Sequence, residues 1–164
     1  MAAADGTTGE EVKKTIDLVS KDGERFEVAR DAALLCKTLR WMIKGGYGRI
    51  PLPNVASPIL ARVVDYLARH AAAAAAAAAA MDDDGLDRFD RDFLAGVDQD
   101  TLFDLLLAAN YLQADGLLDL ACKKVAAMMT GKSPEQMREL FHIVNDLTPE
   151  EEKALREDIA WALN

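Results

Sequence analysis

The sequence predicts an α/β fold in which a small three-stranded sheet near the amino terminus is covered by helices. Two short runs of alternating apolar and polar residues flank an Asp-Gly pair, and a third alternating run follows near residue 50. Between and beyond these runs, apolar residues recur at helical spacing from about residue 31 to the end. The sheet is therefore expected to be small and the helices to form most of the molecule.

The strands are predicted at 16–18, 26–28 and 50–52. Asp22-Gly23 lies between the first two runs and favours a tight turn, so these runs are expected to form an antiparallel hairpin. In the third run Ile and Leu alternate with two prolines. Because proline has no N–H to donate to a neighbouring strand, this third strand is expected at a sheet edge.

The first helices are predicted between residues 31 and 67. Apolar spacing over 31–44 fits either two short helices or one broken helix, and Gly45-Gly46 ends the pattern. Ser57-Pro58 is typical of an N-cap followed by proline at the first helical position, which predicts a helix through Leu67.

A low-complexity insertion is predicted at about 71–87, where ten alanines at 71–80 precede an acidic stretch. Alanine has the highest helix propensity, so the run can extend the preceding helix, but it has no large side chain to bury. We expect a frayed, exposed extension or a disordered loop, followed by solvated acidic side chains. Residues 1–13 show no apolar period and are expected to form a disordered tail.

The second half of the sequence predicts longer helices. Apolar residues surround nearly the whole axis of a helix over 98–112, which predicts a central position. In the helix over 117–129 they cover an arc of about 240°. This arc is wider than one packing face requires, so part of it is expected to await another surface.

Two short helices are predicted near the carboxyl end. Ser133-Pro134-Glu135-Gln136 and Thr148-Pro149-Glu150-Glu151 each combine an N-cap hydroxyl, a proline and a capping-box residue. The helices carry Phe141 and Trp161, and the chain supplies no further core to cover them. Such a pair either folds back on the domain or meets a partner, and aromatic residues near a chain end favour a partner.

Composition excludes several classes of function. The chain has 164 residues, 19 basic and 28 acidic, and its net charge of −9 repels phosphate backbones, so nucleic acid is not an expected partner. The alanine run is about half as long as a membrane span, and no secretory signal precedes it, so neither membrane binding nor secretion is expected. We expect a protein of the nucleus and cytoplasm.

No catalytic or metal chemistry is predicted. Cys36 and Cys122 lack CxxC spacing and are expected to be buried, reduced thiols rather than metal ligands. His70 and His142 are expected to be surface or partly buried residues, because no nucleophile can be assigned beside them. The glycines at 45–48 lack the lysine and hydroxyl of a phosphate loop. The predicted protein is therefore not an enzyme and holds no cofactor.

Several stretches together resemble the signature of the Skp family, the S-phase-kinase-associated linkers of ubiquitin ligases. They are Ile-Pro-Leu-Pro-Asn-Val at 50–55, Leu-Ala-Ala-Asn-Tyr-Leu at 107–112, Leu-Leu-Asp-Leu at 117–120, Gly-Lys-Ser-Pro-Glu at 131–135, Asn-Asp-Leu-Thr-Pro-Glu-Glu-Glu at 145–152 and Trp-Ala at 161–162. The resemblance covers about residues 14–164. The alanine and aspartate segment lies where plant members commonly carry a variable insertion.

The resemblance implies a BTB/POZ-type domain over 14–130 and a helical F-box-binding extension over 131–164. It further implies a non-catalytic adaptor of an SCF-type cullin-RING ubiquitin ligase that joins F-box proteins to a cullin. Asn110 and Tyr111 would contact the cullin N-terminal domain, although Asn110 has the alternative of only ending its helix. The F-box would be contacted by Leu117, Val125, Met128, Met137, Phe141, Ile143, Asn145, Asp146, Leu147, Pro149 and Trp161. Each of these has a core alternative.

The chain departs from the family at places that matter for binding. The family usually reads Phe-Asn-Ile-Lys-Asn-Asp-Phe where this chain reads Phe-His-Ile-Val-Asn-Asp-Leu at 141–147, so Val144 and Leu147 differ. It usually closes with an aromatic residue and an acid, where this chain has Leu163 and Asn164. Losing a buried aromatic at a hot spot costs about 1–3 kcal/mol, which predicts weaker or fewer F-box partners. The competing hypothesis is a BTB-like self-associating module, or a diverged structural one, that no longer joins a ligase.

Overall fold

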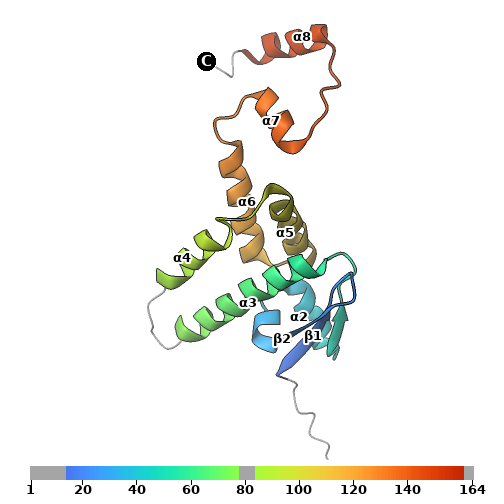
Figure 1. Ribbon diagram of the computed structural model, residues 1–164, viewed down its shortest axis with the longest axis vertical. Helices are drawn as coiled ribbons and strands as arrows, with labels where there is room; N and C mark the ends of the chain where they lie inside the picture. The colour runs from blue at the N-terminus through green and yellow to red at the C-terminus, as the bar shows by residue number, and fades with distance from the viewer. Residues whose placement is uncertain (1–13, 78–83, 161–164) are drawn as a thin grey trace, which may run out of the picture. The chain divides into compact units, whose positions relative to one another are not determined.

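The computed structural model describes residues 14–77 and 84–160, which belong to two compact units (Figure 1). The amino-terminal unit is Met1–Val125 and the carboxy-terminal unit is Ala126–Asn164. The predicted tail at 1–13 lies outside the described residues, as do Trp161, Leu163 and Asn164.

The sheet has the predicted three strands, β1 (Thr15–Val19), β2 (Arg25–Ala29) and β3 (Arg49–Pro51), in the order β2-β1-β3. β1 pairs antiparallel with β2 and parallel with β3, so Leu18 lies opposite both Phe26 and Ile50. The strand that contains proline is at the edge, as predicted. One face of the sheet packs into the core through Ile16, Leu18, Val28 and Ile50, which are all buried.

A side chain of the β1–β2 turn also caps the start of a later helix. Gly23 has φ +85°, which an L side chain rarely adopts, and the preceding Asp22 reaches across to α3 (Ser57–Ala77). Asp22 Oδ1 accepts a hydrogen bond from the Ser57 N–H at 2.8 Å, and Oδ2 accepts one from the Ser57 hydroxyl. The prediction that Ser57 is the N-cap was therefore wrong, because its hydroxyl donates to the turn and Asp22 supplies the capping oxygen.

The segment between the strands forms two helices, α1 (Arg30–Ala33) and α2 (Lys37–Lys44), which resolves the alternative that the periodicity left open. Gly45 is the C-cap of α2, and Gly46 follows with φ +85°. In Figure 1 these helices lie beside the strands and α3 runs past them; α3 packs on α1, on β2 and on α5 (Gln99–Leu112). The core formed there contains fully buried Leu18, Leu39, Ile50, Leu52, Leu60, Leu67, Leu102, Leu105, Leu112 and Leu117.

The described parts of the predicted insertion are helical. Residues 71–77 continue α3, and a helix that the sequence did not predict, α4 (Asp84–Phe93), follows the undescribed residues. His70 of α3 stacks on Tyr66 with ring centroids 4.0 Å apart, and its Nε2 lies 2.7 Å from Asp90 Oδ1. The prediction that the acidic side chains are only solvated was wrong for Asp90.

α5 is covered on one side only. Its N-cap Asp98 accepts a hydrogen bond from the Thr101 N–H at 3.1 Å, and its buried residues are Leu102, Leu105, Ala108, Ala109 and Leu112. Leu107, on the opposite side, is 63% exposed. The predicted central position was wrong, because an apolar residue on every side of a helix does not require a neighbour on every side.

α6 (Asp115–Met129) is buried only near its start, at Leu117 and Ala121. From Cys122 onward its side chains are half-buried or exposed, which confirms that part of the wide apolar arc is left uncovered. Cys122 is exposed, so the prediction of a buried thiol was wrong there. Cys36 is buried, and burial raises the pKa of its thiol to about 12.

Candidate protein-binding surfaces

The last two helices, α7 (Pro134–Phe141) and α8 (Pro149–Ile159), begin as predicted. The Ser133 Oγ accepts from the Gln136 N–H at 3.3 Å, and the Gln136 Oε1 accepts from the Ser133 N–H at 3.0 Å. The Thr148 Oγ1 accepts from the Glu151 N–H at 3.3 Å, and the Glu151 Oε2 accepts from the Thr148 N–H at 2.9 Å. These boxes satisfy helix-start amides without any tertiary contact, so both starts are specified locally.

Charged side chains join α7 to α8. Arg138 Nη1 lies 3.2 Å from Glu152 Oε1, Arg156 Nη2 lies 3.4 Å from the same oxygen, and Arg156 also pairs with Glu135. Ion pairs at a solvated surface contribute about 0–1 kcal/mol each. No residue of either helix is buried, so the described part of this unit is not held by an apolar core of its own.

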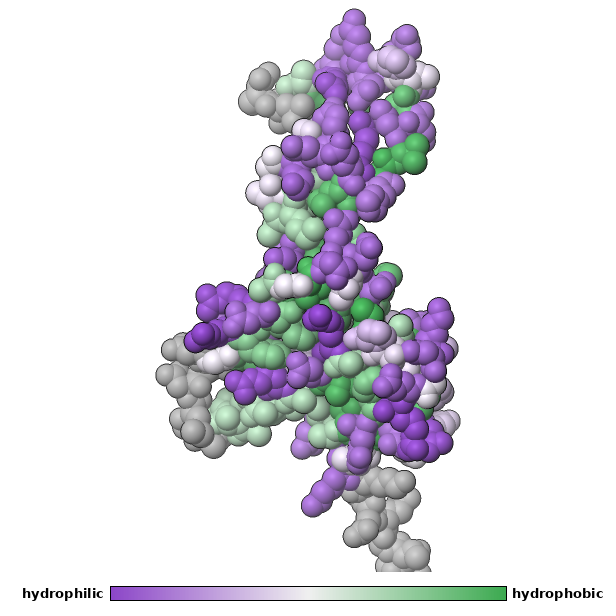
Figure 2. Space-filling model, viewed as in Figure 1, coloured by the Kyte–Doolittle hydropathy of each residue, from purple (hydrophilic) through white to green (hydrophobic). Residues whose placement is uncertain are grey.

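Large apolar side chains lie at the surface of this unit. α7 ends where His142 adopts φ 54°, and the segment after it exposes Ile143 by 56%, Val144 by 83% and Leu147 by 37%. Figure 2 shows such hydrophobic side chains, in green, among the hydrophilic ones around α7 and α8. We call α7 together with the segment 142–148 the α7 surface.

The structure separates the predicted F-box contacts into three groups. Ile143, Asn145, Asp146, Leu147 and Pro149 are exposed, and Val125, Met128, Met137 and Phe141 are half-buried. Leu117 is completely buried in the core of the amino-terminal unit, so for this residue the core alternative holds. Asn145 also has a local role, because its Oδ1 accepts a hydrogen bond from the Leu147 N–H at 3.3 Å and shapes the loop.

The predicted cullin contacts lie near the end of α5. Asn110 is exposed and Tyr111 is half-buried, with its carbonyl oxygen accepting from the Thr38 Oγ1 at 3.1 Å. Asn110 does not end the helix, which continues to Leu112 and is capped by Gln113 at φ 52°. The side chains of Asp104, Leu107, Asn110 and Tyr111 share one side of the helix by their spacing. We call these four residues the α5 surface.

Sequence reasoning missed Leu107 as part of the α5 surface. A signal was present, because at 100° per residue Leu107 lies between Tyr111 and Asn110 on a helical wheel, and both of these were predicted to contact the cullin. Because apolar residues occur on nearly every side of this helix, the sequence pattern did not distinguish the exposed Leu107 from the buried leucines.

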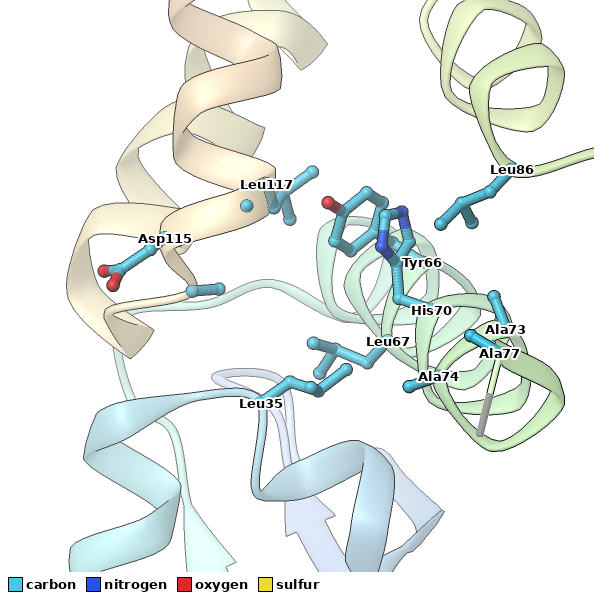
Figure 3. Close-up of a pocket in the computed structure, with 12 residues that line it drawn as sticks. Leu35, Tyr66, Leu67, His70, Ala73, Ala74, Ala77, Leu86, Asp115 and Leu117 are labelled. Atoms are coloured by element: carbon cyan, nitrogen blue, oxygen red, sulfur yellow. The ribbon is translucent and has the colours of Figure 1, made fainter. Parts of the chain in front are cut away.

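An apolar cavity of about 320 Å³ lies between α3, α4 and the start of α6 (Figure 3). Tyr66 and His70 project into it from α3, Leu86 faces them from α4, and the Asp115 carboxylate points away. A Cβ on Gly116 would lie 2.9 Å from the Tyr66 hydroxyl oxygen, so glycine permits this close approach. Burial, with the charges of Asp90 and Asp119 adding to it, raises the pKa of the Tyr66 phenol. The ring of Tyr66 thus packs as a neutral core group.

Across residues 14–77 and 84–160, no three His, Cys, Asp or Glu side chains are grouped so as to hold a metal ion. None of the helices in those ranges is long and apolar enough to cross a membrane.

The fold and these surfaces define the class of protein first. A small sheet with covering helices forms a BTB/POZ-type domain, and a helical region with uncovered apolar side chains follows it. Residues 14–72 match the Skp1 family tetramerisation domain, and residues 115–162 match the Skp1 family dimerisation domain.

Curated relatives extend the match over nearly the whole chain. SKP1-like protein 4 of Arabidopsis thaliana is 49% identical over 93% of this chain and 98% of its own length. SKP1-like protein 1 of Oryza sativa subsp. japonica is 49% identical over 92% of this chain and 95% of its own length. The SCF ubiquitin ligase complex protein SKP1a of Dictyostelium discoideum is 42% identical over 89% of this chain and 94% of its own length. The chain belongs to the Skp1 family, which confirms the resemblance seen in its motifs.

Proposed function

We propose that this protein is a non-catalytic adaptor of an SCF-type ubiquitin ligase that joins an F-box protein to a cullin. The observation that carries the proposal is the α7 surface, where large apolar side chains stand exposed in the segment between two helices whose starts are specified locally. Family membership supports it, since two relatives from Dictyostelium discoideum are named SCF ubiquitin ligase complex proteins.

The F-box partner would bury the apolar groups of the α7 surface. Each of Ile143 and Leu147 would lose exposed area to the partner, and burying a large aliphatic side chain contributes about 1.5–3 kcal/mol. Capped helices also lower the conformational entropy that is lost on binding, because their first turns are already ordered. Trp161, which lies outside the described residues, is proposed to join this contact.

The cullin partner would bind the α5 surface. Leu107 offers exposed apolar area, Tyr111 a partly exposed aromatic ring, and Asn110 an amide that can donate and accept hydrogen bonds. This composition fits a protein interface with an apolar centre and polar edges. With both surfaces on one chain, the adaptor acts by holding two partners, and it supplies no reacting group.

The F-box half of the proposal is tested by charge substitution on the α7 surface. Ile143→Asp should weaken binding of a purified F-box domain by at least about tenfold, measured by isothermal titration calorimetry, because a carboxylate would be buried at the interface. Leu107→Asp is the matched control, since Leu107 is 63% exposed and lies on the α5 surface, outside the proposed F-box contacts. Equal affinity for wild type and Ile143→Asp would contradict the proposal.

The cullin half is tested separately. Tyr111→Lys should abolish association with a cullin N-terminal domain in size-exclusion chromatography and leave F-box affinity unchanged. Loss of both activities would indicate misfolding instead, which circular dichroism of the variant would reveal.

Self-association is the second candidate. It is favoured by one observation: the two family matches are described as dimerisation and tetramerisation domains. Light scattering on the chain alone and mixed with an F-box domain separates the two functions. A one-to-one heterodimer supports the adaptor, whereas a homodimer that the F-box domain does not dissociate supports self-association.

A further inference from the structure

The exposed face of α2 is basic, although the chain as a whole has a net charge of −9. Leu39 and Ile43 are buried on one side of this helix. The other side, spanning about 100° of the helical circumference, consists of four exposed residues. We call it the α2 basic face, and its members are Lys37, Arg40, Trp41 and Lys44.

An unusually exposed tryptophan lies in this face. Trp41 is 72% exposed, and Lys44 Nζ lies 5.8 Å from its ring centroid, in cation–π range. A second aromatic residue, Tyr47, is 63% exposed, and its ring lies against Gly45, where a Cβ would be 3.1 Å from Tyr47 Cε2. Two exposed aromatic rings thus lie near the end of α2, and that of Trp41 is in cation–π range of the Lys44 ammonium group.

Two of the three cationic side chains of the α2 basic face have no carboxylate partner among the described residues. Arg40 donates from Nε at 3.2 Å and from Nη2 at 2.9 Å to the carbonyl oxygen of Leu34. Within residues 14–77 and 84–160, no carboxylate lies in ion-pair range of Arg40 or Lys44, while Lys37 Nζ is 2.5 Å from Asp115 Oδ2. At least two cationic groups are therefore positioned beside a tryptophan and available to an anion.

We propose that the α2 basic face, together with Tyr47, binds a short acidic peptide segment of a partner protein with an apolar or aromatic residue between its carboxylates. Guanidinium and ammonium groups supply the complement to carboxylates, and arginine matches a carboxylate with two parallel hydrogen bonds. Tryptophan, tyrosine and arginine are the residues that most often dominate binding energy at interfaces. This surface shares no residue with the α5 or α7 surfaces, so the inference goes beyond the adaptor function.

The size of the anion follows from electrostatic screening. At physiological salt the Debye length is about 8 Å, so a short peptide interacts mainly with the charges of the α2 basic face. An extended polyanion, such as a nucleic acid or an anionic membrane, also meets the acidic remainder of the molecule and is repelled. The observations therefore favour the peptide.

Fluorescence anisotropy of the full-length protein tests the proposal. The probe is a labelled peptide with glutamates on both sides of one phenylalanine, and its matched control has glutamines at the same positions. The acidic peptide should bind saturably and about tenfold or more tightly than the control, and high salt should weaken it. Trp41→Ala and Arg40→Glu should each weaken binding about tenfold. Lys153→Glu, which reverses an exposed charge in α8, should have no effect.

Several results would overturn the proposal. One is that the glutamine peptide binds as tightly as the acidic peptide, and another is that Trp41→Ala binds the acidic peptide as tightly as wild type does. A third is that phosphatidylserine vesicles or single-stranded RNA bind more tightly than the acidic peptide and that the same variants abolish this binding. Both substituted side chains are exposed, so the variants should fold, and unchanged affinity for an F-box domain verifies this.

Discussion

Asp22 connects two elements through one carboxylate. It lies in the hairpin turn and accepts two hydrogen bonds from Ser57 at the start of α3. The hydrogen bond from the Ser57 hydroxyl is the main cause that lowers the pKa of Asp22 from 3.8 to about 2, and burial opposes it. The ionised form is thus favoured in the folded protein, which links folding to pH.

Substitution of Asp22 should therefore destabilise the protein in a pH-dependent way. Because the folded pKa is depressed, the stabilisation is complete above the ordinary pKa near 4 and is lost as the pH falls toward 2. Urea unfolding midpoints of wild type and Asp22→Ala should differ most above pH 4 and converge near pH 2. Glu24→Ala, a carboxylate of the same turn, serves as control. A midpoint difference that does not change with pH would contradict this linkage.

Leu147 stands where the family usually has phenylalanine. It is 37% exposed on the proposed F-box surface, so a larger ring has room to contact a partner. Leu147→Phe should strengthen F-box binding by about 1 kcal/mol, measured by calorimetry, since aromatic anchors dominate interfaces. Leu107→Phe, the same change at a 63% exposed position of the α5 surface, is the matched control and should change F-box affinity little. Weaker binding by Leu147→Phe would argue against this contact.

At the scale of elements, α4 is held to α3 by aromatic rings. Phe93 lies 5.6 Å from Tyr66 and 5.5 Å from Phe89 between ring centroids, and Arg69 stacks on Phe89 at 5.9 Å. His70 and Asp90 add a polar contact at 2.7 Å. A helix with many aspartates is therefore ordered by the few residues that face its neighbour.

Phe93→Ala should loosen α4 selectively. Each aromatic pair contributes about 0.5–1.5 kcal/mol beyond its buried area, and this variant removes two pairs. Hydrogen exchange with mass spectrometry should show faster amide exchange in α4 and unchanged protection in the sheet. Asp92→Ala removes only a surface pair with Arg88 at 3.8 Å and should leave exchange near that of wild type. Unchanged α4 protection in Phe93→Ala would mean that the rings do not anchor the helix.

At the scale of the whole molecule, the two units differ in how they are stabilised. The amino-terminal unit has a core of fully buried leucines, isoleucine and valines, whereas α7 and α8 bury no residue. Helices without an apolar core depend on local capping, surface ion pairs and whatever covers their apolar groups. A partner on the α7 surface is therefore expected to stabilise that unit in particular.

Binding of an F-box domain should protect the carboxy-terminal unit and leave the sheet unaffected. A ligand stabilises what it binds by mass action, so protection should rise with the concentration of the F-box domain. Hydrogen exchange in α7 and α8 should slow by about tenfold or more at saturation, and exchange in β1, β2 and β3 should not change. Ile143→Asp should remove the effect. Equal slowing in both units would indicate a global change in stability instead.

Features with local causes were predicted correctly. The Asp-Gly turn, the edge strand with its proline and the two capping boxes all depend on residues a few positions apart, and all occur as expected. The errors lie where distant segments meet. Ser57 is bound by a turn 35 positions away, α4 is ordered by rings of α3, and Leu117 belongs to the core. The spacing of apolar residues along a helix does not determine which other segment packs against its apolar face, or whether any segment does.

The amino-acid sequence by itself determined the family, the small sheet, the helix starts and the surplus of apolar residues toward the carboxyl end, because these follow from short-range chemistry and motif order. Only the tertiary structure decided which apolar residues are covered. It placed Leu117 inside, left Leu107 and Ile143 outside, and brought Trp41 and the cations of α2 to one exposed face. Burial depends on contacts between segments far apart in the chain, and these exist only once the chain has folded.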